Sequence, residues 1–163
     1  MTDALFEDPG ITAMGLLNEV YAGLHARFVP LLARHGLSNA EFEVLIRLAR
    51  SPGRRLRMSD LAAQTTLSTS GTTRVVDRLE RDGLVERTSC ASDRRGFFAQ
   101  LTGTGLERLE SVMPDHNALI ARWFTGLLPP DRLERLLGDL RVIRDQVSPG
   151  ATAGSDCPAE LPA

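Results

Sequence analysis

The sequence predicts a mainly α-helical protein that carries one short β-hairpin. Apolar residues recur every three or four positions over 11–35 and again over 102–147, which is the spacing of amphipathic helices. Between these regions, residues 84–88 and 97–101 alternate in polarity on either side of a polar loop that ends in glycine. Such a pattern is typical of two paired strands. With 163 residues, the chain is long enough for one domain with its own core.

Two helices are expected in the N-terminal part of the chain. The first spans 11–35, and Pro30 is expected to kink it or thin its last turn. Ser38 followed three residues later by Glu41 is a capping-box pattern. A second helix is therefore expected over 39–50.

Two shorter helices are expected in the central region, ahead of the hairpin. Residues 54–58 are read as a short extended piece, too basic to belong to the core. Ser59 is the expected cap of a third helix over 60–64, and Ser68 is the expected cap of a fourth over 69–82. Two such helices joined by a tight turn form a helix-turn-helix, in which the second helix enters the DNA major groove.

The fourth helix has two unlike faces at 100° per residue. Its apolar face, expected to be buried, consists of Thr72, Val75, Val76 and Leu79. Its opposite face consists of Ser70, Thr73, Arg74, Asp77, Arg78 and Arg81. Short side chains at the N-terminal end allow a close approach to DNA, and the free N–H groups there favour a phosphate. Arg74 can reach a guanine or a phosphate, and Asp77 is expected to orient Arg74 or Arg81.

Charge is unevenly distributed along the chain. The formal net charge is −2, yet residues 47–95 hold 11 Arg and 6 acidic residues, against 8 Arg and 15 acidic residues elsewhere. A cationic centre of this kind is the electrostatic footprint of a DNA-contacting lobe. All 19 basic residues are Arg; codon usage explains the missing Lys equally well, but it does not explain the clustering.

Two further helices are expected after the hairpin. One begins at Thr102, and Pro114 is expected to bend it or divide it in two. The last helix spans about 131–147. Residues 148–163 are rich in Pro, Ala and Gly and have almost nothing to bury, so they are expected to form a disordered tail.

Four sequence blocks resemble the MarR family of winged helix-turn-helix transcriptional regulators. They are GLSNAEFEVL at 36–45, LSTSGTTRVVDRLERDGLVER at 67–87, SDRR at 92–95 and LTGTG at 101–105, and they occur in the order that the family shows. The resemblance covers about 16–147. It implies a single domain over 11–147, after a flexible N-terminus at 1–10. Within this domain, a winged helix-turn-helix lobe with a short three-stranded β wing occupies 38–101, and the helices of 11–35 and 102–147 form a dimerisation arm.

The resemblance also implies a partner and a binding site. A homodimer would bind a pseudo-palindromic operator on double-stranded DNA, most often as a repressor. The wing pair Asp93 and Arg95 would place Arg95 in the minor groove, where the negative potential attracts Arg. Thr72 is at odds with this role because it lies on the expected buried face. The candidate DNA-binding residues are Arg57, Ser59, Ser68, Thr69, Ser70, Gly71, Thr72, Thr73, Arg74, Arg78, Asp93, Arg94 and Arg95.

Members of this family usually lose DNA affinity when a small, often phenolic or aromatic effector binds between the arm and the DNA lobe. In this chain such a crevice would be lined by the first, second and fifth helices. Each candidate is alternatively an ordinary core or dimer-interface residue, which is the interpretation that we favour. The candidate effector-pocket residues are Met14, Tyr21, His25, Phe28, Phe42 and Arg47.

Several other classes of protein do not fit the sequence. It has no nucleophile–base–acid set and no Gly-rich phosphate loop, so we expect no enzyme and no cofactor. Cys90 and Cys157 lack partners at metal-ligand spacing. No apolar run approaches the ~20 residues of a membrane span, and the acidic N-terminus lacks a signal sequence, so a cytoplasmic location is expected. The alternative function is a winged-helix module for protein–protein contact without specific DNA binding.

Overall fold

The computed structural model describes residues 6–90 and 93–154; residues 1–5, 91–92 and 155–163 lie outside its described part, as do the side chains of residues 90–96. The predicted fold class is confirmed, because helices predominate and one three-stranded antiparallel sheet is present. The elements follow in the order α2 (Pro9–Arg34), α3 (Asn39–Ala49), η1 (Pro52–Arg54), β1 (Arg55–Arg57), α4 (Met58–Gln64), α5 (Thr69–Arg81), β2 (Val85–Cys90), β3 (Asp93–Leu101), α6 (Gly103–Trp123), η2 (Thr125–Leu127), α7 (Pro130–Val147) and η3 (Pro149–Thr152).

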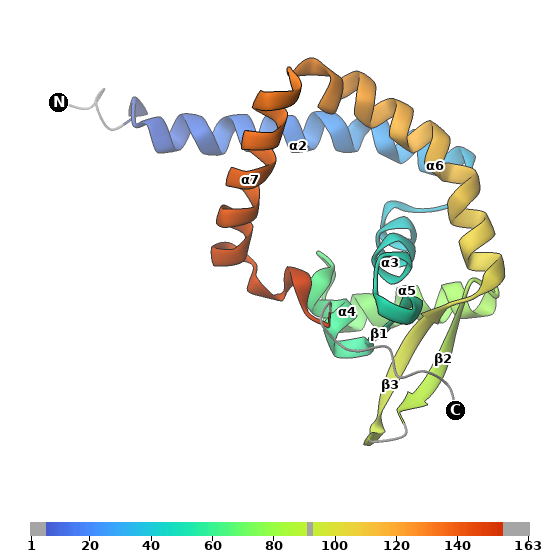
Figure 1. Ribbon diagram of the computed structural model, residues 1–163. Helices are drawn as coiled ribbons and strands as arrows, with labels where there is room; N and C mark the ends of the chain where they lie inside the picture. Colours follow the sequence, from blue (N-terminus) through green and yellow to red (C-terminus); the bar gives the residue numbers. More distant parts are fainter. Residues whose placement is uncertain (1–5, 91–92, 155–163) are drawn as a thin grey trace.

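The long helices surround a smaller lobe. In Figure 1, α2, α6 and α7 form an arch around α3, and η3 brings the chain back to α4. The sheet projects from the opposite side of the lobe (Figure 1). Where α2 ends, His35 Nε2 lies 2.9 Å from Asp115 Oδ2 of α6, and Arg108 of α6 donates to the His35 carbonyl. These contacts join the end of α2 to the middle of α6.

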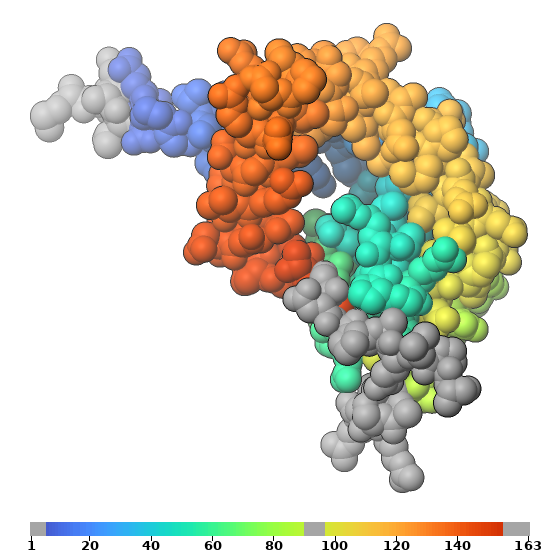
Figure 2. Space-filling view, in the orientation of Figure 1, coloured from blue at the N-terminus to red at the C-terminus, as the bar shows by residue number. Residues whose placement is uncertain are grey.

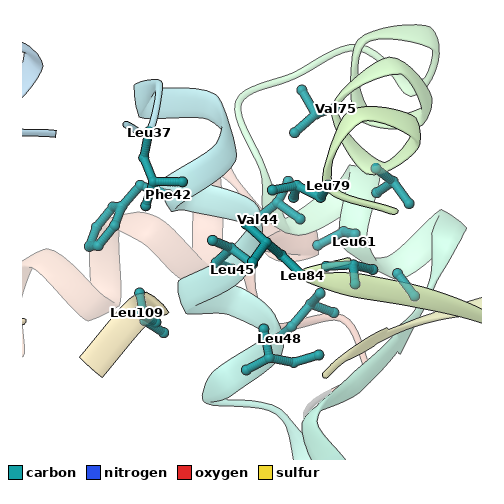
Figure 3. Packing of buried hydrophobic residues seen from close by; sticks show 14 of the residues in the cluster. Leu37, Phe42, Val44, Leu45, Leu48, Leu61, Val75, Leu79, Leu84 and Leu109 are labelled. Carbon is teal, nitrogen blue, oxygen red and sulfur yellow. The ribbon is translucent and has the colours of Figure 1, made fainter. Parts of the chain in front are cut away.

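The hydrophobic core lies where α3 meets α4, α5 and the sheet. Leu45 and Leu48 of α3 are completely buried, as are Leu61 of α4 and Leu79 of α5. Figure 3 shows these side chains converging from the separate helices. The core positions α5, because its apolar face is held here while its other face stays in solvent.

Both predicted serine caps that begin α3 and α5 are confirmed. Ser38 and Glu41 form a complete capping box at the start of α3. Ser68 caps α5 by accepting from the Gly71 N–H. The cap predicted at Ser59 is wrong: α4 begins at Met58, two residues before the expected start at Asp60, and no side chain caps it.

The extended piece before α4 contributes to the core, contrary to expectation. It forms β1, in which Leu56 is only 2% exposed while Arg55 and Arg57 on either side are half-buried. Alternation along a strand explains this result, because the central side chain faces inward when its two neighbours face out. β1 pairs with β3, which also pairs with β2, so the strand order is β1-β3-β2.

The hairpin strands extend further than the sequence suggests. The polar segment at 90–96 was expected to be loop, but β2 reaches Cys90 and β3 begins at Asp93. Their register shifts between Ser89 and Cys90. Backbone pairing does not require an apolar side chain, so polarity alone underestimates the length of an exposed hairpin.

Neither internal proline interrupts its helix. α2 runs through Pro30 to Arg34, and beyond Pro30 the buried Leu31 and Leu32 hold the last turn on the core. α6 runs through Pro114 as one helix that curves around the lobe (Figure 1). Of the two alternatives expected at Pro114, the division of the helix is wrong, and the bend is the one that the structure shows.

The C-terminal segment is ordered further than predicted. A disordered tail was expected from residue 148, but η3 packs on α4. A Cβ built on Gly150 would lie 3.1 Å from Ala63 Cβ, and the Gln64 side chain donates to the Ala153 carbonyl. Glycine allows the backbones of η3 and α4 to approach this closely. A prediction of disorder from amino-acid composition cannot detect such a contact between two segments. Within the described residues, no helix is both long and apolar enough to cross a bilayer.

Candidate nucleic-acid interface

The N-terminal end of α5 presents short polar side chains to solvent. Ser68 Oγ accepts from the Gly71 N–H at 3.1 Å. The side chains of Ser68, Thr69, Ser70 and Thr73 are exposed, and Gly71 is half-buried. A helix N-terminus carries a positive partial charge and free N–H groups. This end of α5 therefore offers small, polar and electropositive surface that can approach a phosphate closely.

Thr72 does not belong to this surface. Its side chain is completely buried; it donates to the Ser68 carbonyl at 3.1 Å and lies 3.4 Å from the Thr65 hydroxyl. A side chain with no exposed area cannot contact DNA, so the assignment of Thr72 as a DNA-binding residue is wrong. The helical periodicity had placed it inward, and the structure agrees with the periodicity.

The two central arginines of α5 differ in their surroundings. Arg74 is exposed, and no hydrogen bond or ion pair holds its side chain within the described part of the chain. Arg78 Nε instead donates to Glu41 Oε1 of α3 at 3.0 Å. Burial raises the pKa of Glu41, but hydrogen bonds from Ser38 and Arg78 and the charge of Arg78 outweigh this effect and lower the pKa below its ordinary value. Arg78 therefore anchors α5 to α3, while Arg74 is available to a ligand.

A second ion-pair network fixes α5 to the sheet. Arg87 of β2 donates to Asp77 Oδ1 and Glu80 Oε2 of α5, both at 2.5 Å. Asp77 was expected to orient Arg74 or Arg81. Its carboxylate binds Arg87 instead, although Arg81 Nε donates to the Asp77 backbone carbonyl at 3.3 Å. Sequence reasoning missed Arg87. It sets the direction of the hairpin relative to α5, so it positions the interface without belonging to it.

The base of the wing is also cationic. The guanidinium groups of Arg55 and Arg57 lie 5.0 and 5.5 Å from the centre of the Phe98 ring, within the range of a cation–π contact. Arg57 is half-buried. Ser59 is exposed in the first turn of α4. Arg57 thus lies at the root of the wing, and Ser59 lies in the first helix of the helix-turn-helix.

The tip of the wing carries the remaining predicted contacts. The backbone of Asp93, Arg94 and Arg95 belongs to β3, so the three residues follow the hairpin turn. Their side chains lie outside the described part of the chain. The minor-groove role of Arg95 therefore stays a prediction.

Three of the six predicted effector-pocket residues line one cavity. Tyr21, Phe42 and Arg47 border a cavity of about 300 Å³ between α2, α3 and the turn before α5. Met14 is exposed on the first half of α2, and neither His25 nor Phe28 borders this cavity. We call it the aromatic cavity. Its remaining lining residues are Asn39, Glu43, Ile46, Arg50 and Thr66.

Phe28 packs against a histidine that the sequence reasoning did not assign to any site. The His116 ring of α6 lies 4.7 Å from the Phe28 ring and 4.6 Å from the Phe42 ring, centre to centre. Burial lowers the pKa of His116, and a hydrogen bond with Asn117 only partly opposes this effect. No hydrogen bond satisfies its buried Nδ1 within the described residues. His116 is therefore a neutral aromatic spacer between α2 and α3.

The described residues contain no cluster of three or more His, Cys, Asp or Glu side chains that could hold a metal ion. The polar face of α5 presents the exposed side chains of Ser70, Thr73 and Arg74. This face offers hydrogen-bonding groups on a rigid helix, as a binding surface does.

Known proteins resemble this chain in sequence and in fold. The model of the MarR family matches residues 35–96. Transcriptional repressor MprA of Escherichia coli is 32% identical over 119 residues, which cover 72% of this chain and 68% of MprA. Two curated relatives from Bacillus subtilis, at 35% and 32% identity, are covered over 62% and 66% of their own length. The chain thus spans just under two thirds of these two proteins.

Solved structures extend the similarity to the helices outside the lobe. AbsC of Streptomyces coelicolor, a MarR family transcriptional regulator, is 38% identical with a TM-score of 0.77, over 86% of this chain and 95% of AbsC. Sco3205 of the same organism, solved in complex with DNA, is 31% identical with a TM-score of 0.76, over 90% of this chain and 91% of Sco3205. The chain therefore belongs to the MarR family of winged helix-turn-helix transcriptional regulators.

Proposed function

We propose that the chain acts in the cytoplasm as a homodimeric repressor that binds a pseudo-palindromic operator and releases it when a small aromatic effector binds. The observation that carries this proposal is the division of α5 into two faces. Val76 and Leu79 are fully buried, whereas Ser70, Thr73 and Arg74 are exposed. A rigid helix with exposed hydroxyl and guanidinium groups suits readout of base edges and phosphates in a major groove.

Unpaired apolar surface on the arm supports the homodimer. Ile11, Met14, Leu17 and Val20 of α2 are exposed, although their spacing is that of a buried stripe. No residue of α7 is buried, and its exposed apolar residues include Val142, Ile143 and Val147. Extended apolar surface of this kind marks an interaction site. A second copy of the chain would cover both helices and place two α5 helices on one DNA duplex.

The aromatic cavity supports the effector response. Its volume of about 300 Å³ reaches the lower end of the range for small-molecule sites. Glu43, one of its lining residues, accepts from both the backbone N–H and the hydroxyl of Thr66 at 3.1 Å. Thr66 lies in the turn between α4 and α5. A ligand that displaces Glu43 would therefore disturb the turn that aims α5.

The direct test is a gel-shift titration with DNA from upstream of the chain's own coding sequence. We expect a salt-sensitive shift that resists unrelated competitor DNA, because phosphate contacts release counterions. Sedimentation equilibrium on the same preparation should give twice the chain mass. Binding that any competitor removes equally well would overturn sequence-specific recognition, and a monomer at micromolar concentration would overturn the dimer.

A further inference from the structure

The C-terminal segment at 149–154 leads from the arm back to the DNA lobe. It consists of η3 and the turn after it, and it begins directly after Ser148, the residue that caps the end of α7. On the face of the molecule shown in Figure 2, open space separates α7 from α3. The segment therefore connects the C-terminal end of α7 to the lobe.

Two contacts hold this segment on the last turn of α4. A Cβ built on Gly150 would lie 3.1 Å from Ala63 Cβ and 3.3 Å from the Ala63 carbonyl oxygen, so a larger residue would have to push the two backbones apart. The Gln64 side chain is only 7% exposed and donates to the Ala153 carbonyl. A buried amide that loses its hydrogen-bond partner is unfavourable. This hydrogen bond therefore opposes release of the segment.

A third contact lies at the end of the segment, on the first turn of α4. Gly154 has a φ of +77°, which glycine adopts at no steric cost. A Cβ built there would lie 3.0 Å from Asp60 Oδ2 and 3.0 Å from Leu56 Cδ2. The segment therefore follows α4 from its last turn back to its first, and it also lies against β1 at the root of the wing.

The helix that the segment holds is packed tightly against α5. Leu61 of α4 and Leu79 of α5 are completely buried in the same core. At the end of α4, the Thr65 hydroxyl lies 3.4 Å from the Thr72 hydroxyl of α5. A close-packed interior has low compressibility and transmits displacement. A restraint on α4 is therefore also a restraint on α5.

The lobe has another attachment to the arm, at α6. His35, which follows α2, lies 2.9 Å from Asp115 of α6, and the His116 ring lies 4.6 Å from the Phe42 ring of α3. Figure 1 shows α6 on one side of α3, while the chain after α7 reaches α4 on the other side. A single attachment would leave the lobe free to swing about it. Two attachments on opposite sides of α3 oppose this rotation.

We infer that residues 149–154 form a clamp, which fixes the lobe relative to α7 and so determines the half-site spacing that the dimer accepts on its operator. This inference rests on the homodimeric repressor proposed above. Two recognition helices of a dimer reach their half-sites only when the spacing matches the distance between them. One inserted base pair moves a half-site by about 3.4 Å and rotates it by about 35°. A clamped lobe resists this displacement, whereas a released lobe can follow it.

Matched valine substitutions in the full-length protein test the clamp. Gly150→Val places a side chain against Ala63 and should release the segment, which lies on the surface and yields before the core does. Gly103→Val is the control, because a Cβ at Gly103 meets no atom within 4 Å. Hydrogen exchange measured by mass spectrometry should show faster exchange at 149–154 in Gly150→Val alone. Gly154→Val, which places its side chain against Asp60, takes its place if Gly150→Val does not fold or does not release the segment.

Fluorescence anisotropy then measures the spacing that each protein accepts. The duplexes carry the operator found in the gel-shift titration, or the same operator with one base pair inserted or removed between its half-sites. We expect the wild type and Gly103→Val to bind the altered duplexes at least about tenfold more weakly than the operator. The released variant should lose no more than about threefold.

The ratio of the two affinities decides the inference, because a uniform change in DNA affinity does not alter it. A released variant with the wild-type ratio would overturn the clamp, and so would a wild type that binds all spacings equally. Unchanged exchange at 149–154 in both clamp variants would overturn it as well. A wild type that binds no operator would instead refute the proposed function.

Discussion

Adjacent threonines on α5 allow the two faces of this helix to be tested with one chemical change. Thr72→Val and Thr73→Val each replace a hydroxyl by a methyl of similar size. Thr72 is completely buried and donates to the Ser68 carbonyl at 3.1 Å. Thr73 is exposed, and its hydroxyl donates to the Thr69 carbonyl at 3.0 Å. The substitutions therefore probe the core and the proposed interface separately.

Thr72→Val should cost stability and not DNA affinity. It removes one buried neutral hydrogen bond, so we expect the free energy of unfolding to fall by about 1 kcal/mol. Thr73→Val should change stability by less than about 0.5 kcal/mol, as surface substitutions generally do. Urea unfolding at one fixed protein concentration measures both values, since unfolding of a dimer depends on concentration.

Fluorescence anisotropy with a labelled operator duplex supplies the second half of the test. Thr73→Val should weaken DNA binding about threefold to tenfold, which is the loss of one hydrogen bond. Thr72→Val should leave DNA affinity within about twofold of the wild type. If Thr72→Val weakened DNA binding as much as Thr73→Val while retaining full stability, the division of α5 into a buried and a binding face would be refuted.

Three further predictions concern the arm and the C-terminal segment. His116→Phe should reduce the loss of stability below pH 6.5. Burial lowers the folded-state pKa of His116 from 6.5, so the unfolded chain binds more protons and the free energy of unfolding falls as the pH falls through this window. Urea titrations at pH 7.5 and 5.5 that show the same loss of stability in the wild type and the variant would contradict this. Gly105→Ala should destabilise the protein by about 2–3 kcal/mol, because its Cβ would lie 2.0 Å from the Leu84 carbonyl oxygen. Gly103→Ala is the control, because a Cβ at that position meets no atom within 4 Å. Equal melting temperatures of the two variants would refute the close approach at Gly105. Gly150→Val should release η3 from α4 and raise the amide exchange rate of residues 149–154, measured by mass spectrometry; unchanged exchange would show that η3 does not depend on this contact.

Local rules predicted much of the fold. In the caps of α3 and α5, a serine side chain accepts a hydrogen bond from a backbone N–H three residues later. The two partners are close together in the sequence, so the sequence alone reveals the cap. The buried face of α5 follows from helical periodicity, and Thr72, Val75, Val76 and Leu79 are all buried as predicted. Where periodicity and family resemblance disagreed, at Thr72, periodicity was correct because it describes this chain's own packing.

Contacts between distant residues could not be predicted in this way. Arg78 pairs with Glu41 across 37 positions, and Arg87 binds Asp77 and Glu80 from another element. Nothing in the spacing of these residues selects one partner among the many acidic side chains. His116 escaped notice because a single histidine in an amphipathic helix has no pattern. The packing of Gly150 on α4 depends on a close approach of two backbones, which amino-acid composition does not indicate.

The N-terminal half of α2 shows another limit of prediction from sequence. Its apolar stripe correctly predicted a helix, but Met14, Leu17 and Tyr21 are exposed, so the stripe did not identify what covers it. Periodicity shows that a face avoids water. It does not distinguish a chain's own core from a second copy or from a ligand.

The central claim is that the exposed face of α5 reads DNA, and Arg74 tests it most directly. Arg74 is exposed and unpaired within the described residues. Anisotropy titrations with the operator duplex should show that Arg74→Ala lowers affinity about tenfold or more, which corresponds to one good arginine contact. Arg141→Ala, an exposed arginine on α7, should bind as the wild type does. A folded, dimeric Arg74→Ala protein with wild-type affinity would contradict the account.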